Sequence, residues 1–186
     1  MAELFVVGEV LGASGFNGNN LVCKYAVAFG ENWRLSEGEA SGQTQTDYPK
    51  GGMAIWSHPI DLHFTTRSVL GWPKLALQVF RIDQYGNYDL EGYGYVQIPI
   101  SPGMYNLKCV TWKPTGTLKE EFAESFMGIT PRLRDESLVV SSEDRRQLRT
   151  RSSGIIYVNL SLIERELERQ GVSTQGEQSD GAGVSD

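Results

Sequence analysis

Residues 21–29 read LVCKYAVAF, and large apolar side chains occupy every second position of this stretch. The same alternation recurs in residues 60–64 (IDLHF), 75–79 (LALQV) and 158–162 (VNLSL). Alternation with a period of two places one face of a strand against a core and the other face in solvent. The sequence therefore predicts half-buried β-strands.

Turn-forming residues separate these apolar stretches. Clusters of Gly, Pro, Asn and Ser stand at residues 12–20, 49–52, 71–73, 85–87 and 101–103. About eight short strands at this spacing are typical of an antiparallel β-sandwich. We therefore expect an all-β fold, an eight-stranded antiparallel sandwich.

One segment, residues 117–128, has a helical pattern instead. Leu118, Phe122 and Phe126 are four residues apart, and Thr117 with Glu120 has the spacing of a capping box. The sequence predicts one short helix inserted between late strands. Two roles are open for the apolar stripe of this helix: it packs on the sandwich, or it is a docking surface for a partner.

The chain has 186 residues, of which 40% are hydrophobic, and a net charge of −6. This length and composition fit one globular domain, which we expect at residues 2–170, followed by a disordered tail at 171–186. The negative charge disfavours binding to nucleic acid and to anionic lipid. Because the sequence has no secretory signal and no apolar stretch of about 20 residues, we expect a chain that is cytosolic or attached to a cytosolic structure such as the cytoskeleton.

Residues 56–64 (WSHPIDLHF) hold both histidines of the chain. Asp61 and His63 would project from the same face of a strand, whereas the direction of His58, before a proline, stays open. A metal-dependent or acid–base site at these three residues is one interpretation. The other interpretation is structural: the polar residues lie on the outer face of the strand, and Ile60, Leu62 and Phe64 are buried on its inner face. A nucleophilic role for Ser57 is weaker, since no glycine elbow surrounds it.

Four early glycines, Gly8, Gly12, Gly15 and Gly18, do not form a phosphate-binding loop, because they lack the Lys-Ser/Thr pair that closes it. We interpret them as a loop between the first two strands. The two cysteines, Cys23 and Cys109, are too few for a disulfide framework or for a zinc site of their own. We expect both to be reduced and buried.

Six arginines gather between Arg132 and Arg151, with an excess of only two positive charges over the acidic residues among them. This stretch includes Arg145, Arg146 and Arg149. Two interpretations of this stretch are open. It is a solvated surface whose charges are partly paired, or it is a binding site for an acidic partner or a lipid headgroup. These three arginines, together with Trp72 in the turn at 71–73, are the candidate interaction residues.

Residues 79–100 (VFRIDQYGNYDLEGYGYVQIPI) place an acidic loop between two strands. This stretch resembles the third loop of C2 domains, where aspartates bind calcium. Asp83 and Asp89 match two of these aspartates, but Arg81 stands in place of the first. Since Ca²⁺ needs six to eight oxygen ligands, we predict no calcium site here.

Further motifs extend the resemblance over residues 2–170: GEVLGASGF at 8–16, CKY at 23–25, GQTQTD at 42–47, WSHPIDLHF at 56–64, GWP at 71–73 and GYG at 92–94. Together they resemble the B9 domain family. The resemblance implies a C2-like sandwich in a non-enzymatic subunit of the complex at the ciliary transition zone, near the basal body. It also implies paralogous B9-domain proteins and tectonic-type membrane proteins as partners, and no cofactor. The alternative function is a peripheral lipid-binding module that does not need calcium.

Overall fold

The computed structural model describes residues 1–16, 18–49, 51–115 and 149–167, and in them it contains strands and no helix. These residues form nine strands: β1 (Ala2–Ser14), β2 (Leu21–Ala28), β3 (Trp33–Gly38), β4 (Ser41–Gln43), β5 (Met53–Thr66), β6 (Lys74–Ile82), β7 (Tyr88–Gln97), β8 (Gly103–Pro114) and β9 (Thr150–Arg165).

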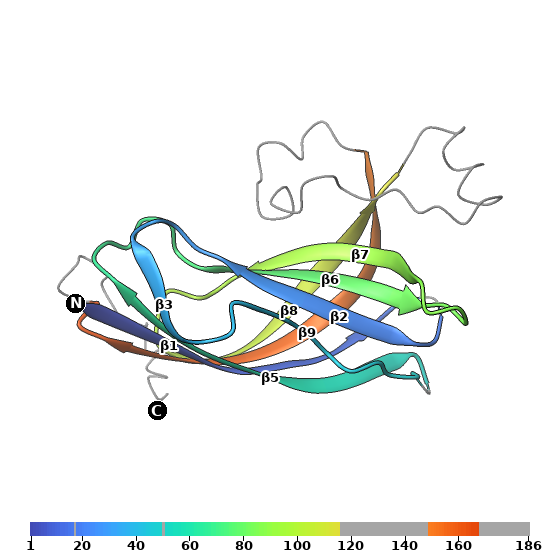
Figure 1. Ribbon diagram of the computed structural model, residues 1–186, viewed down its shortest axis with the longest axis horizontal. Helices are drawn as coiled ribbons and strands as arrows, with labels where there is room; N and C mark the ends of the chain where they lie inside the picture. Colours follow the sequence, from blue (N-terminus) through green and yellow to red (C-terminus); the bar gives the residue numbers. More distant parts are fainter. Residues whose placement is uncertain (17, 50, 116–148, 168–186) are drawn as a thin grey trace, which may run out of the picture.

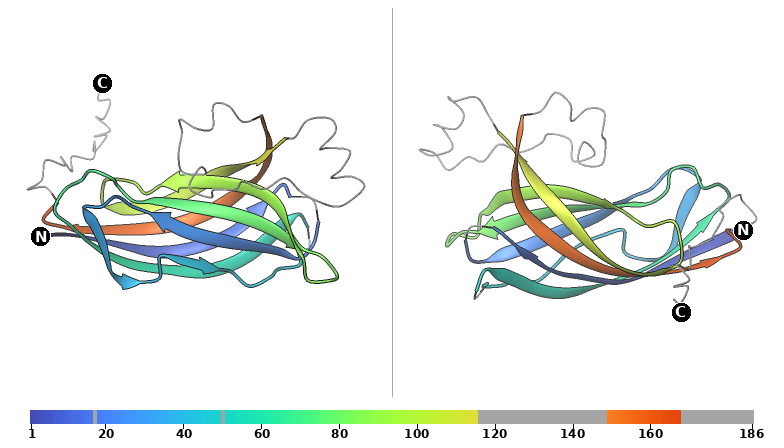
Figure 2. Two further views of the ribbon diagram at one scale, coloured as in Figure 1. Left: turned by 45° about the horizontal axis from the view of Figure 1, so that its top comes forward. Right: turned by 180° about the vertical axis from the view of Figure 1, so that it is seen from behind.

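All nine strands belong to one antiparallel sheet with the order β3-β5-β1-β9-β8-β7-β6-β2-β4. The sheet curls, so that β1, β5 and β9 form one layer and β2, β6 and β7 form a facing layer (Figure 1). Strands β8 and β9 run together along the back of the molecule (Figure 2, right), and β8 connects the two layers. The expected sandwich is therefore a single curled sheet and not two separate sheets.

The main core lies between the two layers, where the sequence alternation places it. Leu62 and Phe64 of β5 are fully buried, as are Leu77 and Val79 of β6 on the facing layer. Val158 of β9 joins the same cluster. The predicted inward faces of residues 60–64, 75–79 and 158–162 are confirmed.

A second, smaller apolar cluster lies on the opposite face of β2, β6 and β7. It contains Val22, Phe80, Leu90 and Tyr93, all of them buried. The ammonium group of Lys24 on β2 lies 5.2 Å from the centre of the Phe80 ring. The alternation in residues 21–29 predicted solvent on this face of β2, and that prediction is wrong for Val22.

Strands β7 and β8 approach each other closely and pair in register at Tyr93 and Trp112. A Cβ atom on Gly94 would lie 2.5 Å from the Cys109 sulfur, and one on Gly92 would lie 2.9 Å from Thr111 Oγ1. The GYG motif therefore makes room for β8 at the place where the sheet turns from one layer to the other.

Several sequence predictions need correction. The described part of the chain has nine strands, not eight, because the short edge strands β3 and β4 consist mostly of exposed polar residues without an alternating pattern. Gly8 and Gly12 lie inside β1, not in a loop, and side chains there would collide with the backbones of β9 and β5. The predicted helix at 117–128 and the tail at 171–186 lie outside the described residues. Within the described ranges, no helix has the length and hydropathy for a membrane span.

Candidate functional site

The loop that resembles a calcium-binding loop is held by an ion pair across two strands. Arg81, near the end of β6, is the register partner of Asp89 near the start of β7. Its Nη2 atom donates a hydrogen bond to Asp89 Oδ2 at 3.2 Å. Asp89, one of the two aspartates that match the calcium-loop pattern, is therefore paired with the guanidinium group of Arg81.

The other aspartate, Asp83, holds the turn between β6 and β7. Its Oδ1 atom accepts hydrogen bonds from the backbone N–H groups of Tyr85 (2.7 Å) and Asn87 (2.8 Å), and its Oδ2 atom accepts one from Asn87 Nδ2 (2.9 Å). The side-chain hydrogen bond from Asn87, followed by the backbone one, lowers the pKa of Asp83. Both oxygens of this carboxylate therefore accept hydrogen bonds from residues of the same loop.

A third carboxylate, Glu91, was not among the residues that the sequence singled out. Its side chain is only 10% exposed, and it lies 3.1 Å from Lys113 Nζ and 3.7 Å from Arg81 Nε. Ser153 of β9 donates a hydrogen bond to its backbone carbonyl. No sequence signal marks this residue, because its cationic partner Lys113 is 22 residues away, on β8.

The charges at this end of the molecule therefore satisfy one another. Arg81 contacts Asp89 and Glu91, and Lys113 contacts Glu91. In the ranges that the structure describes, no three His, Cys, Asp or Glu side chains meet in a group that could hold a metal ion.

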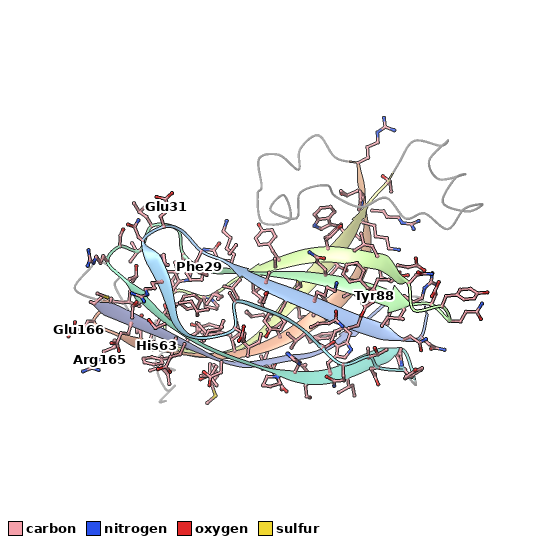
Figure 3. The ribbon with its side chains drawn as sticks, viewed as in Figure 1. Phe29, Glu31, His63, Tyr88, Arg165 and Glu166 are labelled. Atoms are coloured by element: carbon pink, nitrogen blue, oxygen red, sulfur yellow. The ribbon has the colours of Figure 1, made fainter. Side chains whose placement is uncertain are left out.

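The residues of the WSHPIDLHF block separate on the two faces of β5 (Figure 3 labels His63). His58 is half-buried on the core side, where its ring lies 5.6 Å from that of Tyr25. Asp61 and His63 lie on the outer side; Asp61 is exposed, and His63 stacks on Phe5 with ring centres 4.2 Å apart. The three candidate ligands thus do not converge. The outer-face interpretation of Asp61 and His63 fits this arrangement.

Ser57 lies in an irregularity of the β1–β5 pairing, next to the register shift between Val10 and Gly12. It is exposed and has a positive φ of 44°. His58, the following residue, points to the opposite face of the strand. The geometry therefore gives Ser57 no adjacent histidine that could act as a base.

Trp72 is half-buried and packs against the main core. Its indole N–H donates to the carbonyl of Ile98 at 2.8 Å, and its ring meets that of Trp33 edge-on with centres 4.9 Å apart. Gly71, at φ 77°, provides the turn that brings Trp72 inward. Only part of this side chain is left for contact with a partner, and its role in an interface stays a prediction.

Of the three candidate arginines, only Arg149 lies in the described residues. It is exposed, immediately before β9, and its carbonyl accepts a hydrogen bond from the Thr115 N–H at 2.8 Å. Arg145 and Arg146 lie outside the described ranges. Arg151, two residues further along, is exposed opposite Lys113 of β8.

Both cysteines are buried in the main core and are not bonded to each other. Burial raises the pKa of the Cys109 thiol to about 12 and raises that of Cys23 even further. Both therefore remain neutral thiols that pack as small apolar side chains, as predicted.

The outer face of β5, β1, β9 and β8 has exposed apolar side chains that the sequence analysis did not single out. Val7, Met104 and Ile163 are all exposed there. The available signal was the uninterrupted apolar run Leu4-Phe5-Val6-Val7, which has no polar alternate positions.

Comparison with known proteins agrees with the motifs. Residues 4–163 match the family described as ciliary basal body-associated, B9 protein. B9 domain-containing protein 2 of Danio rerio is 47% identical over 175 residues, which cover 94% of this chain and 100% of that protein. The Homo sapiens protein of the same name is 43% identical over 173 residues, 92% of this chain and 99% of that one.

Among solved structures, the C2A domain of plant extended synaptotagmin 1 is similar with a TM-score of 0.43 and 16% identity; the match covers 86% of this chain and 92% of that one. The family match covers most of the chain, and the relatives match over nearly their whole length. The chain belongs to the B9 family of ciliary basal body-associated proteins.

Proposed function

We propose that this chain is a non-enzymatic structural subunit of the complex at the ciliary transition zone, where it supports cilium assembly and the diffusion barrier. Its partners in this proposal are paralogous B9-domain proteins and tectonic-type transition-zone proteins. Membership of a basal body-associated family supports a location at the base of the cilium.

The observation that carries the proposal is the internal use of the acidic loop. Asp83 holds its own turn, Asp89 pairs with Arg81, and Glu91 pairs with Lys113. A loop whose carboxylates are already satisfied does not offer several free oxygen ligands to Ca²⁺. Binding through protein surfaces is then the function that the fold supports best.

The test is to tag the full chain in a ciliated cell, locate it by microscopy and purify it with its partners. We expect a signal between the basal body and the axoneme, and co-purification with both paralogous B9-domain proteins. A chain that is distributed throughout the cell and that purifies without either paralogue would refute the proposal.

A calcium-independent lipid-binding module is the second candidate. Arg149, directly before β9, and Arg151, within β9, are both exposed. Such a cationic group attracts anionic headgroups, by about 1 kcal/mol per residue near a membrane surface. The test is sedimentation of the chain at low salt with neutral vesicles and with anionic vesicles that contain phosphoinositides. Equal binding to both kinds of vesicle would eliminate this candidate.

A further inference from the structure

The central strands β1 and β9 have some apolar side chains on the face away from the core. On that face, β1 presents Phe5 and Val7 between Glu3 and Glu9. β9 presents Ile155 and Ile163, with polar residues between them. An antiparallel strand with one solvated face normally has polar residues there. Val7 and Ile163 depart from this rule, since both are exposed.

The exposed fractions show that this outer face has no cover from the described residues. Met104 is 89% exposed, Ile163 58% and Val7 43%. The register places Val7 opposite Ser161, and Ser161 opposite Met104, so that a single row crosses β1, β9 and β8. Large exposed apolar side chains that gather on one face of a protein mark interaction sites.

A groove crosses this outer face next to the same row. It has a volume of about 430 Å³, and Val7, Gly8, Pro59 and Met104 are among the residues that line it. Among the described residues that line it, Glu9 is the only charged one. The groove is therefore lined by apolar and uncharged polar side chains and carries a single negative charge.

Two carboxylates lie at the β1–β5 side of the groove. Glu9 Oε1 accepts one hydrogen bond from Asn159 Nδ2 at 3.1 Å, which leaves its other oxygen available. Asp61 is the register partner of Val7 on β5 and is exposed. This edge attracts a cation and repels an anionic headgroup.

We infer that the outer face of β5, β1, β9 and β8 is the docking site for a protein partner that places a large apolar side chain in the groove and a Lys or Arg beside Glu9 and Asp61. The inference rests on the proposed function, since it names the surface through which the subunit assembles. A second copy of the chain fits less well, because its equivalent surface brings the same carboxylates.

Photo-crosslinking tests the surface and captures whichever molecule lies against it. A photoreactive benzophenone amino acid replaces Met104 in the full chain, expressed in a ciliated cell. The control replaces Tyr85, which is 81% exposed in the β6–β7 loop, away from this face. We expect a protein adduct at position 104 whose crosslinked peptide has Lys or Arg near a large apolar residue, and no such adduct at position 85.

Four results would overturn the inference: no adduct at position 104, the same adduct from both positions, an adduct only to lipid, or an adduct only within the chain or to a second copy. Each of them shows that this face does not receive the stated partner. Wild-type protein and both substituted chains are compared by circular dichroism, so that a misfolded variant is recognised.

A binding assay with the two paralogous B9-domain proteins separates this inference from the proposed function. Met104→Glu and Asp61→Lys are each expected to weaken binding by about tenfold or more, whereas the control Tyr85→Glu leaves binding unchanged. If the wild-type chain binds both paralogues and Met104→Glu binds equally well, the inference fails and the proposed function stands. If the wild-type chain binds neither paralogue, the proposed function fails. The crosslinking result then still shows whether the outer face binds a protein partner.

Discussion

Arg81 and Asp89 are direct register partners on β6 and β7, and their charged groups meet at 3.2 Å. The guanidinium side chain is 44% exposed, so the ion pair contributes little to stability. Its consequence is electrostatic: a fixed positive charge lies beside the Asp89 carboxylate, in the loop whose sequence resembles a calcium-binding loop.

We predict that the wild-type chain binds no Ca²⁺ at micromolar concentration, because the carboxylates of the loop are already paired. Isothermal titration calorimetry checks this, with the double variant Asp83→Asn/Asp89→Asn as the control. Saturable heat in the wild-type chain that disappears in the double variant would contradict the prediction.

Asn87→Ala is expected to raise the pKa of Asp83 toward the ordinary value of 3.8, because the hydrogen bond from the Asn87 side chain is the largest cause that lowers it. A lowered pKa in the folded state stabilises the fold at pH values above 3.8, and this contribution is lost as the pH falls through the folded-state pKa. The variant should therefore lose less stability than the wild type on acidification below that pH. NMR titration of the Asp83 carboxyl carbon measures the shift, and an unchanged pKa would show that the backbone donors suffice.

Gly94→Ala is expected to destabilise the fold by about 1–3 kcal/mol, because the added methyl group meets the Cys109 sulfur in a packed core. Cys109→Ala in the same chain removes that sulfur and should recover part of the loss. Urea unfolding of the wild type, both single variants and the double variant measures the coupling. Strictly additive losses would mean that the sulfur is not what excludes the side chain.

Lys113→Met is expected to cost about 3 kcal/mol, because it leaves the largely buried Glu91 carboxylate with only the weaker contact to Arg81. The double variant Glu91→Gln/Lys113→Met removes both charges and should be more stable than Lys113→Met alone. Thermal unfolding of the three proteins gives the comparison. Equal stability of the single and double variants would show that water already solvates Glu91.

The core side of the strands follows from the sequence because the side-chain period of a strand is two, whatever its neighbours are. The inward faces of residues 60–64, 75–79 and 158–162 could therefore be predicted without coordinates, and the B9 motifs identified the family. Edge strands β3 and β4 could not be predicted, since they bury little and show no alternation.

Partners that are distant along the chain were decided by the tertiary structure alone. Glu91 meets Lys113 because the strand order places β7 beside β8. Val7 lies in one row with Ser161 and Met104 because β9 lies between β1 and β8. Local periodicity reports which way a side chain points. The register between strands decides what it meets, and register depends on the packing of the whole sheet.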